Sequence, residues 1–473
     1  MVRVLIMARS TAVARTGIWT AFYFFILLDF LLIWFFGSFR ISSQEQGPAQ
    51  RNIGFVPFDP NYFTQIWVIL AIFLQFGIIY FGFLWKASKE PKYEIFPTDN
   101  SPGILYHYFT VDQLVAFIDS IAASVSTKPV KYDKIFVLRN PVSRLFSYSG
   151  FGKKIVVLDP AMLQIAQTHE LRAFLAQNMM LISTRLSLIR MVHSQSQFFW
   201  YVIIIPPIYT ILKEIFQIAP IGPVPLNLLH FTQVIFLFIV FIISVFMLKP
   251  LHLRILNNAN DRVMMISDLL AADIVGKRAM INMLVKQGQR SEVLAVLLEE
   301  FRWLEQLSKG RLYDFEEYRL LEYVQKFPID QLDAQLAKEM ASLIYLRDQM
   351  LTLQKIYNCE ILEMEYTLQR AQEKLKEKRK LYLDDVKKRF DEKKLDRIPE
   401  DARISLKTNL MDWKHIDVDR DTILNEDEIK ILTDALQRKK KKGQGNVFAY
   451  ELAPGVISGV ESRILNIYKN VDE

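Results

Sequence analysis

The stretch LNLLHFTQVIFLFIVFIISVFML, residues 226–248, decides the class of this protein. It carries no Asp, Glu, Lys or Arg, and a helix that stays this apolar on every side is unusual in a soluble core. About 20 such residues are enough for a helix to cross roughly 30 Å of hydrocarbon. The stretch is therefore predicted to span a membrane. Three further runs are nearly as apolar and are predicted to do the same: 17–39, 62–85 and 198–219.

The composition agrees with a membrane protein. Of the 473 residues, 51% are hydrophobic, and the mean hydropathy is +0.14. Pro206 and Pro207 interrupt the third run, so a re-entrant segment is the alternative there, and a cleaved signal peptide is the alternative for the first run. The single cysteine, Cys359, excludes an internal disulfide and fits a reducing compartment.

The charges that flank the apolar runs predict the topology. Basic residues gather before the first run, after the second and after the fourth, which places both termini and residues 86–197 in the cytoplasm. The expected location is therefore the cell inner membrane, with several passes through the bilayer. The basic residues in question are Arg3, Arg9, Arg15, Lys86, Lys89, Lys92, Lys249 and Arg254.

One acidic residue, Asp29, lies near the middle of the first run. A charged group at the centre of a membrane helix costs on the order of 2.5–3.5 kcal/mol. We therefore expect Asp29 either to contact a polar residue of another span, such as Gln65, Gln75 or Gln233, or to be protonated.

Residues between the second and third runs predict a small folded region. An amphipathic helix is expected over 110–126, followed by two short β-type runs at 134–138 and 154–158 with turn residues between them. A further helix is expected over 169–183. The predicted fold is thus mainly α with a small β-hairpin, in a four-span membrane protein.

This order of elements resembles that of the HtpX-type membrane zinc metalloproteases, which are relatives of the CAAX prenyl proteases. In that family a helix with an H-E-x-x-H motif is followed by a transmembrane hairpin, here 198–248. A later helix, here 263–276, then carries an E-x-x-x-D pattern, and Asp268 fits the Asp of that pattern. The resemblance implies a zincin-like cytoplasmic domain.

The residues at the expected zinc-binding positions have all changed. In the stretch LRAFLAQNMML, residues 171–181, Gln177 and Leu181 replace the two histidines, and Asn178 replaces the glutamate base. Met264 stands in the place of the third ligand. Gln, Leu and Met are not ordinary zinc ligands, and Asn cannot accept a proton from water. The resemblance therefore implies a pseudoprotease, without bound zinc.

An active enzyme with unusual ligands is the competing interpretation. His169-Glu170 is the one His-Glu pair of the chain, but no second histidine follows four residues later. None of the six histidines forms the i, i+4 pair that a zinc helix needs. The simpler interpretation of His169-Glu170 is a helix start.

A charged, helical region follows the membrane part. Apolar residues recur every seven positions between 336 and 382, which predicts an extended helix or an antiparallel helical pair with coiled-coil tendencies. Lysines over 374–394 are balanced by acidic residues, so this part is expected to be a solvated face and not a nucleic-acid site.

A second motif, DVDRDTILNEDE over residues 417–428, resembles the EF-hand calcium loop. Oxygen atoms at alternate positions and a glutamate at the twelfth wrap Ca²⁺ in such loops. The sixth position is normally glycine, and Thr422 there is expected to strain the loop and weaken binding. An acidic helix–turn–helix that has lost the ion is the alternative, and no second loop is present in the sequence to form the usual pair. The tentative calcium ligands are Asp417, Asp419, Asp421, Ile423, Asn425 and Glu428.

These features predict five regions. They are two transmembrane helices in 17–85, the metallopeptidase-like domain in 86–290, a helical arm in 291–398, the EF-hand-like motif in 399–442, and a tail in 443–473 that folds back as a short helix. The expected function is that of a membrane-embedded scaffold that binds a membrane or cytoplasmic protein, modulated by calcium, with homo-oligomerisation open. An active zinc endopeptidase and a structural anchor for the helical arm are the alternatives.

Overall fold

The computed structural model describes most of residues 17–42, 81–95, 110–138, 145–218, 228–289 and 416–471, residues 52–55, and parts of 343–394, with short gaps in several of these ranges and none of 442–458. The chain divides into two compact units. Unit 1 contains Met1–Glu90, Tyr148–Lys154 and Leu181–Ile266. Unit 2 contains Pro91–Ser147, Ile155–Met180 and Ser267–Glu473.

Long helices dominate unit 1. An apolar helix covers Trp19–Ile33, and α7 covers Ser187–Ile218. Helix α8, Leu228–Val275, begins in unit 1 and ends in unit 2, with Pro250 inside it. The unit also has a short helix, α3 (Phe83–Lys89), and a strand, β5 (Tyr148–Gly150). An antiparallel hairpin joins β1 (Phe39–Ser42) to β2 (Asn52–Phe55).

One of the four predicted membrane spans has a counterpart that is long and apolar enough to cross a bilayer. Within the described part of the chain this helix is Phe238–Val275, and Trp19–Ile33 is a shorter apolar helix. Large side chains such as Phe236, Phe246 and Met247 are exposed along α8, as expected for a surface that faces lipid. The predicted span 62–85 lies largely outside the described residues, and the fourth span does not end at residue 248 but continues as one helix to Val275.

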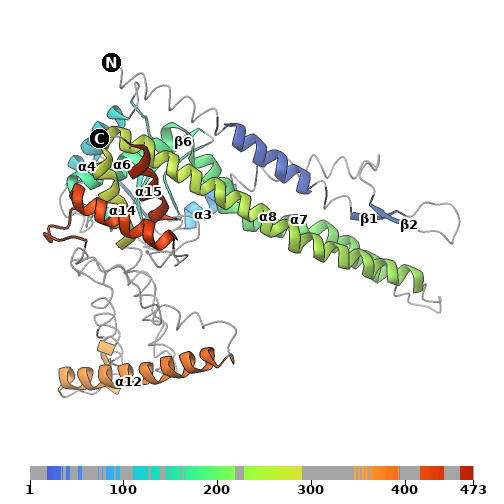
Figure 1. The fold of residues 1–473 in the computed structure, drawn as a ribbon. Coiled ribbons are helices and arrows are strands. Elements are labelled where there is room, and N and C mark those ends of the chain that lie inside the picture. The colour runs from blue at the N-terminus through green and yellow to red at the C-terminus, as the bar shows by residue number, and fades with distance from the viewer. Residues whose placement is uncertain are drawn as a thin grey trace. The chain divides into compact units, whose positions relative to one another are not determined.

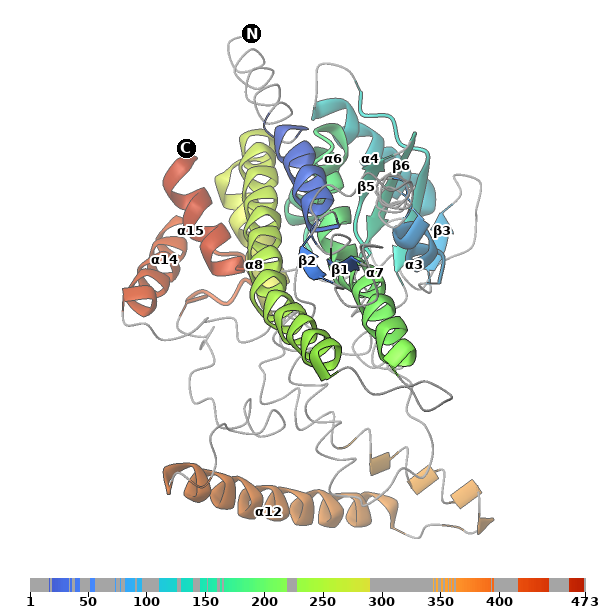
Figure 2. The same cartoon turned by 90° about the vertical axis from the view of Figure 1, so that its right-hand side faces the viewer.

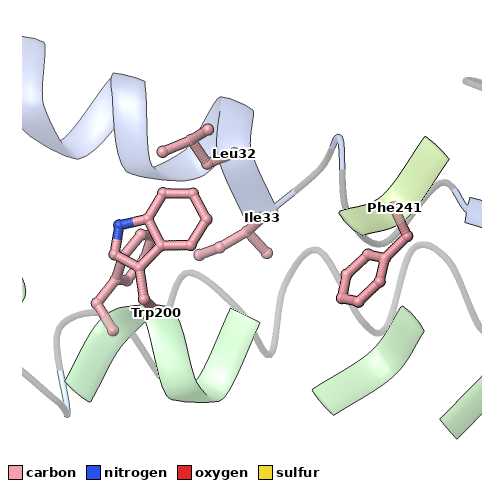
Figure 3. Packing of buried hydrophobic residues seen from close by; sticks show 5 residues of the cluster. Leu32, Ile33, Trp200 and Phe241 are labelled. Carbon is pink, nitrogen blue, oxygen red and sulfur yellow. The ribbon is translucent and has the colours of Figure 1, made fainter. Parts of the chain in front are cut away.

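An apolar cluster holds the three long elements of unit 1 together. Leu32 and Ile33 of the first helix pack near Trp200 of α7, and Phe241 of α8 belongs to the same cluster (Figure 3). Each of these side chains is buried. The first helix is therefore packed against α7 and α8 through large buried side chains.

A polar chain of three side chains lies next to this cluster. The indole N–H of Trp200 donates to Nδ1 of His252 at 3.0 Å, and Nε2 of His252 lies 2.7 Å from Oδ1 of Asp29. Since Nδ1 accepts, the proton of the neutral imidazole is on Nε2, and the ring donates to the carboxylate. The expectation of a polar partner for Asp29 is confirmed by His252, whereas the side chains of the candidate glutamines Gln65, Gln75 and Gln233 lie outside the described residues.

The small sheet of unit 2 differs from the predicted hairpin. Strand β4 (Lys134–Leu138) pairs in parallel with β6 (Lys153–Leu158), and β3 (Lys92–Ile95) pairs antiparallel with β4. A parallel pair needs a crossover, so the turn residues between the two runs do not join them directly. Gly152, with φ of +81°, makes the turn between β5 and β6. The two predicted runs are therefore strands of one sheet, but they pair in parallel and not as a hairpin with each other, and the strand that neighbours β6 across the Gly152 turn is β5.

Several helices complete unit 2. The predicted helices over 110–126 and 169–183 are confirmed as α4 (Val111–Ser124), which starts with a Thr110–Gln113 capping box, and α6 (Thr168–Ser183), which ends in unit 1. After Gly276 a buried helix covers 277–289. The charged arm contains α12 (Met364–Asp391), and the C-terminal region contains α14 (Glu426–Lys441) and α15 (Val460–Asn470), which lie side by side (Figures 1 and 2). The tail thus folds back as the sequence predicted.

Candidate functional site

Helix α6 carries the positions where the resemblance predicted zinc chemistry. At its start, Oε2 of Glu170 accepts the backbone N–H of Gln167 at 2.9 Å, which is half of a capping box. The expected helix-start role of Glu170 is therefore confirmed, although its side chain is fully buried and does not lie on the surface. This start sets the rotation of the helix and buries Gln177 and Asn178 two turns later.

Gln177 is one of three buried polar side chains that meet inside unit 2. Its Nε2 donates to Oδ1 of Asp268 at 2.5 Å. The guanidinium of Arg463, on α15, binds the same carboxylate through two nitrogens, with Nη2 2.8 Å from Oδ1 and Nε 2.5 Å from Oδ2. The side chains of Arg463 and Asp268 are 1% and 0% exposed. One buried carboxylate thus accepts three N–H groups, and its charge is neutralised by a residue 195 positions away.

The other three replaced positions have no chemistry of their own in this arrangement. Nδ2 of Asn178 donates to the carbonyl of Phe174, one turn earlier in α6, at 3.0 Å. Leu181 and Met264 are buried apolar side chains. A carboxamide bonded to its own helix cannot act as a general base, and neither Leu nor Met can activate water.

The one His-Glu pair of the chain lies in an electropositive neighbourhood. Burial lowers the pKa of His169, and the charges of Arg278 and Lys286 lower it further. Burial raises the pKa of Glu170, while Lys286 and the bond from Gln167 oppose that rise. His169 is therefore neutral at physiological pH, but cationic neighbours disfavour a metal ion beside it.

The EF-hand-like loop brings three of its predicted ligands together. Carboxylate oxygens of Asp417, Asp419 and Asp421 lie within 4.8 Å of one another, and within the described residues no other group of three or more His, Cys, Asp or Glu side chains does so. Thr422 has φ of +67°, the left-handed conformation that favours glycine, so the expected strain at this position is confirmed. The three carboxylates fit the oxygen ligands that calcium prefers.

Two further predicted ligands close the loop onto α14. Glu428 accepts the backbone N–H of Val418 at 2.7 Å through Oε1 and that of Asn425 at 2.9 Å through Oε2. The side chain of Asn425 in turn accepts the N–H of Glu428 at 3.0 Å, which completes a capping box. Oε1 also accepts the N–H of Asp419 at 3.5 Å, whereas Oε2 accepts a single N–H and keeps a second lone pair, so this capping does not exclude a metal ion. The N–H of Ile423 donates to Oδ1 of Asp421 at 2.7 Å.

The charge of the loop is itself unfavourable without a cation. Burial raises the pKa of Asp417 above its usual value of 3.8, although the N–H of Thr422 lowers it. The carboxylates of Glu428, Asp421 and Asp419 raise it further. Oδ1 of Asp417 is buried and has no hydrogen-bond partner among the described residues. Repulsion between these carboxylates would be relieved by a bound divalent cation.

Asn282, on the helix over 277–289, takes the place expected for a second EF-hand loop. Its Oδ1 accepts the N–H of Leu424 at 2.7 Å, and its Nδ2 donates to the carbonyl of Leu424 at 3.0 Å. Leu424 is the eighth loop residue, which pairs with a neighbouring loop in ordinary EF-hands. Arg278 also donates to the same carbonyl at 3.1 Å. The side-chain amide of Asn282 thus pairs with both backbone groups of Leu424, as a neighbouring strand would.

Sequence reasoning missed Arg463 and Asn282, which hold these two sites. Arg463 lies between Val460, Ile464 and Ile467 on the apolar face of α15, where a charge is a signal of a buried partner. Asn282 had no such signal, because the helix over 280–287 is apolar on most sides and buried throughout.

Comparison with known proteins adds no family to these observations. No family model, no curated protein and no solved structure matches the chain.

Proposed function

We propose that this protein is a membrane-anchored, non-catalytic relative of zinc metalloproteases that binds protein partners through its cytoplasmic domain. The observation that carries the proposal is the buried cluster of Gln177, Asp268 and Arg463. In zinc sites a ligating histidine commonly donates its second ring N–H to a carboxylate. Gln177 makes the corresponding bond to Asp268 with its amide N–H. The supporting carboxylate has thus been kept while the metal ligand has gone.

Arg463 argues further against catalysis at this position. Its guanidinium is bonded to Asp268, which Gln177 also contacts, and it brings a permanent positive charge into a buried place. A Zn²⁺ ion there would be repelled by that charge at low local dielectric. An active zinc endopeptidase with unusual ligands would need its metal elsewhere, and His169, beside Arg278 and Lys286, is a poor start for such a site.

The same contact weighs against a simple structural anchor for an independent arm. Arg463 belongs to the C-terminal tail, yet it is bonded to Asp268 of the predicted metallopeptidase-like domain. Asn282 and Leu424 likewise join that domain to the EF-hand-like loop. These contacts favour one integrated cytoplasmic module over a separable tail.

The proposed setting is the cell inner membrane, with four spans and both termini in the cytoplasm. One long apolar helix supports membrane association, and the four apolar runs and the flanking basic residues support the finer topology. The lipid bilayer is therefore a proposed partner in addition to a protein.

Calcium binding is proposed as the second property of the module. It is supported by the convergence of Asp417, Asp419 and Asp421 and by the raised pKa of Asp417. Thr422 at the strained sixth position places the expected affinity toward the weak end, in the range of about 10⁻⁴–10⁻³ M. When bound, Ca²⁺ would offset two of the three negative charges of these aspartates and stiffen the loop held by Asn282.

Peptidase activity is the property that decides between scaffold and enzyme. The detergent-purified protein should be incubated with unfolded protein substrates, once with added zinc and once with a chelator. A Gln177→Ala variant should be assayed in the same way. The proposal predicts no zinc-dependent cleavage by either protein. Cleavage that requires zinc and is abolished by His169→Ala would establish the enzyme instead. Crosslinking in membranes, followed by identification of captured proteins, then names the partner.

A further inference from the structure

Helix α15 has the features of a peptide ligand lying in a groove. Four of its five buried residues, Val460, Arg463, Ile464 and Ile467, follow the i, i+3, i+4, i+7 spacing by which amphipathic helices fill grooves in partner proteins, and Leu465 is the fifth. Lys469, on the opposite side from Val460, is exposed. The sequence between α14 and α15 contains Pro454, Gly455 and Gly459, so the two are separate helices and not one interrupted helix.

The anchor of α15 is a charge and not only an apolar surface. Asp268 lies fully buried and receives Nε and Nη2 of Arg463 side-on. The desolvation cost of a buried ion pair can exceed its Coulombic gain, so this pair is weak evidence for stability by itself. Only a guanidinium offers two parallel N–H donors to one carboxylate, so the groove selects arginine over lysine.

The contact between α15 and the groove is incomplete. Nη1 of Arg463 is buried and has no hydrogen-bond partner among the described residues. Gly459 precedes the helix in a left-handed conformation, and no side chain caps the helix N-terminus. Nζ of Lys277 lies 4.5 Å from the centre of the Tyr468 ring, which is one cation–π contact to α15. The chain's own helix therefore leaves one donor of its anchor without a hydrogen-bond partner among the described residues.

We infer that the groove around Asp268, in which α15 lies, is a recognition site for an amphipathic helix of another protein. That helix presents an arginine between aliphatic residues at the spacing of α15, and α15 occupies the groove in the free protein. The inference rests on the proposed scaffold function and names the chemistry of its partner. A partner helix that also satisfies the third nitrogen of its arginine displaces α15. The tethered helix lowers the apparent affinity for partners, because the groove must first be vacated.

The test uses a synthetic peptide of residues 456–473 with a fluorescent label. A variant that ends after Ser458 is expected to bind this peptide, and the full chain at least tenfold more weakly. The Arg463→Lys peptide should bind on the order of tenfold more weakly than the natural sequence, whereas a Lys469→Ala peptide should bind equally well. Equal binding of the Arg463→Lys and natural peptides by a folded protein would overturn the inference.

A second variant covers the case in which the shortened protein does not fold. A protease site inserted after Gly445 in the full chain allows α15 to be cut free after folding. The cleaved helix should remain bound in size-exclusion chromatography and be displaced by excess natural peptide but not by the Arg463→Ala peptide. A fragment that excess peptide never displaces shows that α15 is a fixed part of the fold. Spontaneous dimerisation of the chain through exchanged α15 helices would make a second copy the occupant and overturn the assignment to another protein.

Zinc content and peptidase activity are measured separately from peptide binding. If the protein shows zinc-dependent peptidase activity and still binds the α15 peptide, the proposed scaffold function is wrong and the inferred recognition site stands. If the protein shows no peptidase activity and does not bind the peptide, the proposed function stands and this inference is wrong.

Discussion

Replacing Arg463 by alanine is expected to loosen α15 strongly. The side chains of Arg463 and Asp268 are 1% and 0% exposed, so water cannot take the place of the lost partner. Removing one member of such a buried pair costs about 3–5 kcal/mol, because the other charge stays buried and uncompensated. Asp268 would keep one donor, the amide of Gln177. The local opening equilibrium of α15 should shift by a factor of at least about a hundred.

Hydrogen exchange of the α15 backbone amides measures this opening directly. The matched control is Lys469→Ala, an exposed cation of the same helix, which should change protection by a factor of about two or less. A double variant, Asp268→Ala with Arg463→Ala, should cost less than the sum of the two single changes, since it removes both charges. If protection in Arg463→Ala equals that in Lys469→Ala, the ion pair does not hold the helix and the reasoning fails.

Three further changes test other contacts. The Asn282→Ala change leaves the buried N–H and carbonyl of Leu424 without their amide partner, which costs about 1–3 kcal/mol of stability. The hydrogen-exchange rate of the Leu424 N–H should rise more in this variant than in Asn282→Asp, which keeps the acceptor. Equal exchange rates in the two variants would contradict the pairing. Because the pKa of Asp417 is raised, its ionised form is disfavoured in the folded loop, and this cost is present above the raised pKa and disappears as the pH falls through it. Calcium needs the ionised form, so as the pH is lowered its affinity should start to fall at a higher pH than an ordinary aspartate would cause. An affinity that starts to fall only in the usual range of an aspartate would count against the raised pKa. The Asp29→Asn change keeps an acceptor for the imidazole N–H of His252, so it should lower the unfolding temperature less than Asp29→Leu does. The reverse order would show that this hydrogen bond does not stabilise the protein.

The features that could be predicted from the sequence are those that depend on residues close to one another along the chain. Apolar runs and helical periodicity located α4, α6 and α8, and the loop motif located the three aspartates that converge. The order of the elements also singled out Asp268 and Gln177, and a hydrogen bond joins these two side chains in the structure.

The remaining features depend on contacts between distant parts of the chain. Arg463 and Asp268 are 195 residues apart, and Asn282 and Leu424 are 142 apart, so no local pattern connects them. The direction of β6 was also hidden, because most of its residues are buried and no alternation between faces distinguishes a hairpin from a parallel pair. His252 was missed as the partner of Asp29 because it lies beyond the predicted end of the fourth span, inside the longer helix α8.

Elemental analysis of the detergent-purified protein tests the central claim most directly. Zinc and calcium should be measured together after purification in the presence of both ions, with Asp417→Ala analysed in parallel. The scaffold interpretation predicts far less than one zinc per chain in both proteins, and calcium that is lost in the Asp417→Ala variant. One zinc per chain, retained in Asp417→Ala and lost in His169→Ala, would contradict it and show that the protein holds a metal centre built from other ligands.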